Sequence, residues 1–376
     1  MKRIIKLGAV LSLAAALAAC SSVQNGDLAN NGNNTNKHGE LTVVKGPEQK
    51  PNQDIVVQSI HRFEGASMDK WLSDDQVQLM YTKLVKQATA TEEAQYEYNT
   101  IKVDLSNNEQ KSPAEPAKDD GTFEKEQPSP DGKYVFVQHW KDKYTARNFM
   151  KEVSTGTITE IKGSNYLEIG GWLNNTSYIL AAGSMSGIGD IRQITVDGTV
   201  TLLKLDDPQL GDQPFINFGT GQGRIYYTDS NQTLKQFAPG EPKPTELVKH
   251  AMKFQVSPDG KHLAVEIQQA AGKIGSELRI FDSNGGAEGL SIAKGDLLPY
   301  IEWSPDSSKL AAAVYTENQS GMNGVYIFDS ATGKVSPIGP SYFPQYPLSW
   351  NPSGTRLGVS VADKDGMPVT HIVDFK

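Results

Sequence analysis

The string Gly183-Ser184-Met185-Ser186-Gly187 is the nearest approach in this chain to the motif of a serine hydrolase. That motif is G-x-S-x-G, because a strained turn between a strand and a helix must expose the serine nucleophile. Here the central residue is Met185, and the string falls in a predicted loop between strands. We therefore expect no nucleophilic catalysis at this string.

Metal and phosphate chemistry also lack suitable residues. Asp363-Lys364-Asp365-Gly366 resembles the start of a calcium loop, but position 374, where the loop needs Glu, is Asp, so a hairpin turn is predicted. Gly219 to Gly223 opens a strand rather than a helix, which leaves no helix N-terminus for an anion. We expect no metal and no cofactor. No two histidines have metal-ligand spacing: they stand at positions 38, 61, 139, 250, 262 and 371.

The N-terminus predicts a signal peptide over 1–19. Lys2, Arg3 and Lys6 form a basic start, and an apolar run of 13 residues follows from Leu7 to Ala19. A transmembrane helix needs about 20 apolar residues, so this run is too short to remain as a membrane span.

Cys20, the only cysteine, directly follows that run. Leu17-Ala18-Ala19-Cys20 resembles the lipoprotein box of bacterial lipoproteins, and the resemblance implies a diacylglyceryl group on Cys20 as the first residue of the mature chain. A lone thiol cannot form an internal disulfide, whereas lipidation would explain why a single cysteine is present. The alternative is an ordinary secretory signal cleaved after Ala19. We expect a lipid-anchored protein on the extracytoplasmic side of a cell membrane, without knowing which membrane.

Residues 20–51 are predicted to be the lipidated cysteine and a flexible tether, because they are rich in Asn, Gly and Ser and poor in large apolar residues. Loss of Lys2, Arg3 and Lys6 with the signal peptide takes the formal charge from −8 to −11. An acidic chain without a basic run is a poor ligand for nucleic acid or anionic lipid surfaces. We expect neither as a partner.

A repeat organises residues 52–376, which we interpret as one domain. The prolines at 258, 305 and 352 are spaced by 47 and 47 residues. Weaker copies occur at Trp71, Trp172 and Gly221, so that seven units align. The clear copies are Ser129-Pro130-Asp131-Gly132-Lys133, Ser257-Pro258-Asp259-Gly260-Lys261, Trp303-Ser304-Pro305-Asp306 and Trp350-Asn351-Pro352-Ser353-Gly354.

Each unit predicts four short antiparallel strands. In 300–339 a strand precedes the Pro-Asp turn, an apolar strand follows it, and two more strands are separated by a loop and a turn. Such a small sheet cannot bury both faces alone, whereas several packed around an axis can. The sequence therefore predicts an all-β fold, a β-propeller.

Seven blades are expected, and six if Gly211–Val248 is not a full unit. The last unit lacks a fourth strand, and an orphan strand over 54–60 precedes the first unit. We predict that this N-terminal strand completes the last blade and closes the propeller.

The W-S-P-D-G-K-x-L-A pattern resembles the WD40-like repeat of TolB-type propellers, which also occurs in prolyl oligopeptidase-like peptidases. The resemblance covers about 60–376. TolB has an additional N-terminal domain, whereas here the predicted tether leads almost directly into blade strands. The peptidases have an α/β-hydrolase domain, for which we expect no residues to remain. The resemblance implies an extracytoplasmic propeller that acts as a binding platform.

A ligand face is predicted where loops from the second to the third strand meet the connections between blades. Exposed aromatic side chains in loops often mark recognition sites. The alternative is that several of them fill the channel or pack between blades. The candidates are Trp140, Tyr144, Phe215, Tyr300, Tyr342, Phe343 and Tyr346.

Two functions remain open. The first is a monomeric, non-catalytic binding or scaffold module for a cell-envelope protein or glycan. The second is a propeller-type carbohydrate-active enzyme, a lyase or hydrolase acting at the channel mouth, and we lean away from it. The enzyme would need ionisable residues that converge on the channel mouth, such as Asp212, Glu302, Lys294 and His139.

Overall fold

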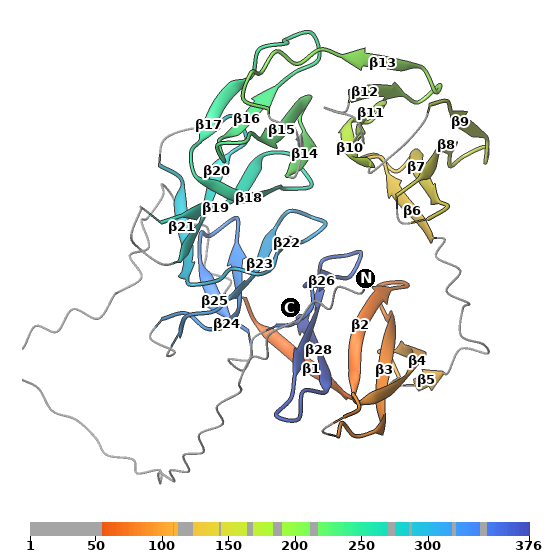
Figure 1. Ribbon diagram of the computed structural model, residues 1–376, viewed down its shortest axis with the longest axis vertical. Helices are drawn as coiled ribbons and strands as arrows, with labels where there is room; N and C mark the ends of the chain where they lie inside the picture. Colours follow the sequence, from red (N-terminus) through yellow and green to blue (C-terminus); the bar gives the residue numbers. More distant parts are fainter. Residues whose placement is uncertain are drawn as a thin grey trace, which may run out of the picture. The chain divides into compact units, whose positions relative to one another are not determined.

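The computed structural model describes 55–89, 91–107, 109–111, 123–142, 144–163, 168–182, 190–210, 217–269, 275–285, 288–317, 321–338 and 344–376. Within these ranges the strands form seven four-stranded antiparallel sheets (Figure 1). The first consists of β2 (Ala66–Trp71), β3 (Gln76–Lys86), β4 (Gln95–Asp104) and β5 (Glu109–Lys111). The second consists of β6 (Phe123–Pro128), β7 (Tyr134–Trp140), β8 (Ala146–Glu152) and β9 (Ile158–Ile161).

The next three sheets repeat this order. The third consists of β10 (Glu168–Asn174), β11 (Ser177–Ala182), β12 (Asp190–Thr195) and β13 (Val200–Leu203). The fourth consists of β14 (Phe218–Gly221), β15 (Arg224–Thr228), β16 (Leu234–Phe237) and β17 (Thr245–Val248). The fifth consists of β18 (Ala251–Val256), β19 (His262–Gln268), β20 (Ser276–Asp282) and β21 (Leu290–Gly295).

The last two sheets carry the C-terminal repeats. The sixth consists of β22 (Ile301–Trp303), β23 (Lys309–Val314), β24 (Gly324–Asp329) and β25 (Val335–Pro337). The seventh has the order β1-β28-β27-β26, formed by β26 (Ser349–Trp350), β27 (Arg356–Ala362), β28 (Pro368–Phe375) and β1 (Val57–Glu64). The predicted β-propeller of seven blades is confirmed, and Gly211–Val248 supplies a full sheet rather than leaving six.

The predicted closing strand is confirmed as well. β1 runs antiparallel to β28, from Val57 opposite Phe375 to Glu64 opposite Val369, and Figure 1 shows the two side by side. The N-terminal strand β1 is therefore the fourth strand of the seventh sheet, whose other three strands come from the C-terminal end of the chain. Backbone hydrogen bonds between β1 and β28 thus join the two ends of the fold.

The Ser-Pro-Asp motif builds a turn between the first and second strands of a sheet. In one copy Ser257 Oγ donates to Asp259 Oδ1 (2.7 Å) and accepts from the backbone N–H of His262 (3.0 Å). Ser304 and Asp306 repeat this arrangement. The motif satisfies the polar groups of a tight turn and recurs because every sheet needs that turn.

Three of the four motif tryptophans join the first strands of consecutive sheets, whereas Nε1 of the fourth, Trp303, has no hydrogen-bond partner among the described residues. In the three, the indole Nε1 donates to a backbone carbonyl of the preceding sheet. The pairs are Trp172 with Gln127 (2.8 Å), Trp350 with Glu302 (2.9 Å) and Trp71 with Ser349 (3.1 Å). These tryptophans, which are easily recognised in the repeat, therefore link consecutive sheets by hydrogen bonds.

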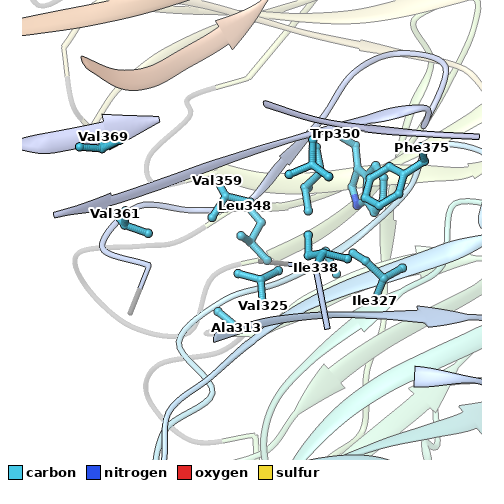
Figure 2. Packing of buried hydrophobic residues seen from close by; sticks show 13 residues of the cluster. Ala313, Val325, Ile327, Ile338, Leu348, Trp350, Val359, Val361, Val369 and Phe375 are labelled. Carbon is cyan, nitrogen blue, oxygen red and sulfur yellow. The ribbon is translucent and has the colours of Figure 1, made fainter. Parts of the chain in front are cut away.

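Side chains from consecutive sheets share the hydrophobic clusters of the core. Figure 2 shows one of them, in which Val325 and Ile327 of the sixth sheet meet Leu348 and Trp350 of the seventh. Equivalent clusters join the fifth sheet to the sixth and the fourth to the fifth. Further clusters join the second sheet to the third, the third to the fourth and the seventh to the first, whereas among the described residues no cluster joins the first sheet to the second.

The seventh and first sheets are also joined by charge. Arg356 on β27 donates to Asp374 (2.9 Å) on β28 and to Asp75 (2.5 Å) in the first sheet. Ser59 on β1 donates to Asp374, and His61 Nε2 lies 3.0 Å from the same carboxylate. Asp374 thus connects the closing strand to the sheet that follows it.

The Asp374 carboxylate predicts an acid-sensitive contribution to stability. Burial would raise its pKa, but hydrogen bonds from Ser59 and His61 and the charge of Arg356 outweigh burial and lower it. A lowered native pKa stabilises the fold above the unfolded value, and this stabilisation disappears as the pH falls through the native value. We expect the stability difference between the native chain and Asp374→Asn to shrink as the pH falls below about 4. Urea unfolding at each pH measures it, and a difference unchanged at pH 3 would contradict this role.

Candidate functional site

The strand order gives every sheet two distinct ends. The motif-turn face carries the turns between first and second strands, such as 351–355. The connection face carries the loops between second and third strands and the connections to the next sheet. At β1, the Lys376 N–H donates to Val56 O (3.0 Å) and the Phe375 N–H to Thr355 O (2.9 Å). The chain therefore enters β1 on the motif-turn face.

The predicted aromatic residues that the structure describes lie in the expected connections but differ in exposure. Tyr144, in the loop between β7 and β8, is 42% exposed. Trp140 at the end of β7 and Tyr346 before β26 are half-buried. Tyr300 donates to Gln345 O (3.0 Å) and packs against the cluster between the sixth and seventh sheets. Tyr300 therefore supports the alternative of inter-blade packing.

Three of the predicted aromatic residues, Phe215, Tyr342 and Phe343, lie outside the described residues, as does Cys20. Their assignment to a ligand face, and that of Cys20 to a lipid, stay predictions.

The connection face carries exposed aliphatic side chains that the search for aromatic residues missed. Ile169 and Met252 each stand second in the first strand of their sheet and are 38% and 40% exposed. Leu297, before β22, is 53% exposed. In the sequence these residues look like ordinary core positions of a strand. Their exposure could have been predicted only from their position near the start of the first strand of a sheet, where the neighbouring sheet does not cover the side chain.

A buried charge cluster lies behind this face. Lys235 Nζ on β16 is 3.0 Å from Asp207 Oδ2 and 2.8 Å from Asp229 Oδ2, and the exposed fractions of the three side chains are 4%, 2% and 0%. The Tyr227 hydroxyl donates to Asp207 Oδ2 (2.6 Å). Asp207 belongs to the connection between β13 and β14, so the cluster anchors this connection to the fourth sheet.

The interactions within the cluster favour the charged forms of Lys235 and Asp207. Burial would lower the pKa of Lys235, but the hydrogen bonds to Asp229 and Asp207 outweigh it and leave the pKa raised. Burial would raise the pKa of Asp207, but hydrogen bonds from Tyr227, from the Gln209 backbone and from Lys235 lower it. Both groups are therefore charged at neutral pH, and none of the three acidic and basic side chains faces solvent. The cluster is a structural anchor rather than a site for proton transfer.

Each of the described ionisable residues that an enzyme could use contacts a different partner. Glu302 on β22 accepts from Gln255 Nε2 (3.1 Å), and burial raises its pKa. Lys294 on the outer strand β21 pairs with Glu277 (3.4 Å), and His139 on β7 pairs with Glu124 (3.1 Å). Asp212 lies outside the described residues.

Metal-ligating side chains do not gather in the part of the chain that the structure describes, where no three of His, Cys, Asp and Glu form a group able to hold an ion. The predicted hairpin turn at 363–366 is confirmed. Asp363 Oδ1 accepts the backbone N–H groups of Asp365 and Met367, both at 2.8 Å. The carboxylate that resembled a calcium ligand is therefore used by the turn itself.

No helix within the described ranges is long and apolar enough to cross a membrane. The predicted signal peptide lies outside those ranges.

Comparison with known proteins shows the fold. No family model matches the chain, and no curated protein matches it. Among solved structures, the uncharacterized protein lmo1340 from Listeria monocytogenes EGD-e has a TM-score of 0.50 and 10% identity, over 81% of this chain and 93% of that one. The comparisons assign no activity.

Two further solved structures are similar at lower scores. The β-propeller domain of the Trilobed protease from Pyrococcus furiosus has a TM-score of 0.47 and 13% identity, over 83% of this chain and 96% of that one. TolB from Acinetobacter baumannii has a TM-score of 0.37 and 14% identity, over 78% and 79%.

Proposed function

We propose that this protein is a lipid-anchored, extracytoplasmic binding module whose connection face binds a protein or glycan of the cell envelope. The supporting observation is the placement of two features on opposite faces. The chain enters β1 on the motif-turn face, whereas Tyr144, Met252 and Leu297 expose apolar surface on the connection face. Exposed apolar side chains can mark a recognition surface, although Leu72 and Val153 expose apolar surface on the motif-turn face as well.

The anchor supports this orientation. Two acyl chains on Cys20 would bury many methylene groups at about 0.8 kcal/mol each, which is enough for stable attachment. Between Cys20 and Ile55 lie 34 residues of polar composition. If these residues form the predicted flexible tether, they would span about 30 Å, which would allow the propeller to stand clear of the lipid headgroups. Attachment through β1 leaves the connection face as the one directed away from the attachment point.

The enzymatic alternative is not favoured. Glu302, Lys294 and His139 each contact a different partner residue, on three different sheets. A glycan-cleaving site needs its acid and base on both sides of one bond, within about 10 Å of each other. A binding role needs only a surface of suitable shape and polarity, which the connection face provides.

Site-specific photo-crosslinking in intact cells tests the proposal. A photoreactive residue at Leu297 or Tyr144 is expected to give discrete adducts with one envelope component, because both side chains lie exposed on the connection face. The matched control is Val153, which is 52% exposed, like Leu297 at 53%, but lies on the motif-turn face beside Lys133. Mass spectrometry of the adduct distinguishes a protein from a glycan.

The anchor is tested in the same cells. Cys20→Ser is expected to abolish incorporation of labelled fatty acid. Adducts at Val153 equal to those at Leu297, or fatty-acid labelling that survives Cys20→Ser, would contradict the corresponding part of the proposal.

A further inference from the structure

The first sheet carries a hairpin that extends beyond its neighbours. β3 pairs with β2 only as far as Tyr81 opposite Ala66, and β4 pairs with β5 only from Lys102 to Asp104. β3 and β4 continue to pair with each other from Thr82 opposite Tyr98 to Lys86 opposite Gln95. We call Thr82–Lys86 and Gln95–Asn99 the arm. At about 3.4 Å per residue it extends about 17 Å past the end of β2, on the connection face.

One side of the arm is apolar. Leu84 lies opposite Tyr96, and Thr82 lies opposite Tyr98, so these side chains share one side of the two-stranded ribbon. Leu84, Tyr96 and Tyr98 are 38%, 44% and 59% exposed. A two-stranded ribbon with an exposed apolar side is marginally stable alone and gains from pairing with further strands.

The outer edge of β4 has no strand partner in the described part of the chain over most of its length. From Gln95 to Ile101 no strand of the described chain pairs with this edge. Exposed edges are normally protected by lysine, proline or a bulge. Over these seven residues the only charged side chain is Glu97, and proline is absent. Within the described residues, the backbone donors and acceptors of this edge therefore have no partner strand, and Glu97 is the one charged side chain on it.

We propose that two copies of this chain pair through their β4 edges, Gln95–Ile101 antiparallel to Gln95–Ile101. The register that uses the whole open stretch places Tyr98 opposite Tyr98 of the second copy. Glu97 then lies opposite Asn99, and Tyr96 lies opposite Thr100. No like charges oppose each other, and the apolar sides of both arms form one continuous surface.

Charge disfavours the neighbouring register that is centred on Glu97. A shift by one residue about the symmetry axis would centre the pair on Glu97 and place two carboxylates directly opposite each other, which is destabilising. An antiparallel pair with both apolar sides on the same face is self-complementary, as a two-fold interface requires. The same edge serves both partners, so the pairing closes at two copies. The proposal replaces the expectation of a monomer and does not depend on what the connection face binds.

Disulfide trapping tests the pairing. Cys20→Ser first removes the only native cysteine, and Tyr98→Cys is then compared with Val85→Cys, whose native side chains are 59% and 61% exposed. Directly opposite residues of antiparallel strands have Cα atoms 4.5–5.5 Å apart, within the range for a disulfide. Under mild oxidation we expect linked dimers to form about tenfold faster from Tyr98→Cys than from Val85→Cys. Equal rates would overturn the proposal.

The register has its own test. Glu97→Cys and Asn99→Cys are expected to link to each other when the two variants are mixed, several-fold faster than either links to itself. Preferential self-linking of Glu97→Cys would show the other register and overturn this one.

Sedimentation equilibrium measures the pairing without a crosslink. Tyr98→Lys places two cations opposite each other, and we expect it to weaken dimerisation about tenfold or more. Glu97→Lys places a cation opposite Asn99 and is expected to leave the dissociation constant within about twofold. Unchanged melting temperatures for both variants would show that the fold is retained. A chain that stays monomeric at all concentrations, or one that dimerises equally well with Tyr98→Lys, would overturn the proposal.

Discussion

Replacement of Lys235 by methionine is expected to lower the free energy of unfolding by about 3–5 kcal/mol, because removal of one partner from a buried ion pair leaves an uncompensated charge. Two carboxylates, Asp207 and Asp229, depend on this ammonium group, and both side chains are almost completely buried. Neither carboxylate can turn to water without movement of the connection between β13 and β14. The expected loss is therefore at the upper end of this range.

A surface lysine provides the matched control. Lys261 also pairs with an aspartate, Asp259 at 3.0 Å, but its side chain is 65% exposed. Lys261→Met is expected to cost about 0–1 kcal/mol, as is usual for exposed pairs. The triple variant Lys235→Met, Asp207→Asn, Asp229→Asn removes all three charges and is expected to recover part of the loss. Urea unfolding measures each value. A loss below about 1 kcal/mol for Lys235→Met would show that the cluster does not anchor the connection.

Deletion of residues 52–60 is expected to lower the melting temperature by about 5–10 °C. The deletion removes the half of β1 that pairs with the end of β28 and takes away Ser59, one of the partners of Asp374. Each lost backbone hydrogen bond costs about 1 kcal/mol, and about 2–4 °C accompanies each kcal/mol in a domain of this size class.

The deletion also opens the longest loop of the fold, since β1 and β28 are more than 300 residues apart in sequence. Deletion of 22–30, of equal length within the predicted tether, is the control and is expected to change the melting temperature by less than about 1 °C. Calorimetry of both variants compares them. An unchanged transition after deletion of 52–60 would show that β1 does not close the propeller.

The repeat could be predicted from the sequence because the hydrogen bonds of its turn join residues that are close together in the chain. Ser257, Pro258 and Asp259 stand next to one another and satisfy one turn among themselves, so the same residues recur wherever that turn recurs. The four-strand unit and the count of seven follow from this spacing. Even the weak unit forms its sheet, β14 to β17, because its first turn is made by Gln222 and Gly223 at positive φ without the full motif.

The site could be predicted only in part. Loops carry no periodicity, and exposure depends on what packs beside a residue rather than on its type. Tyr144 is exposed and Tyr300 is bound to Gln345 O, although both were predicted from the same argument. Met252 and Leu297 have residue types that are usually buried, and only their neighbours leave them exposed.

The amino-acid sequence by itself determined the fold class, the seven repeats and the closing strand, because turns and strand alternation depend on residues within a few positions of one another. It also predicts the lipid on Cys20 from four adjacent residues. Only the tertiary structure decided which residues pair across long separations. It brought Asp207 and Asp229 to Lys235, joined Arg356 to Asp75, and gave β4 no partner from Gln95 to Ile101 among the described strands. Such contacts depend on how whole sheets pack, and no short window of sequence contains that information.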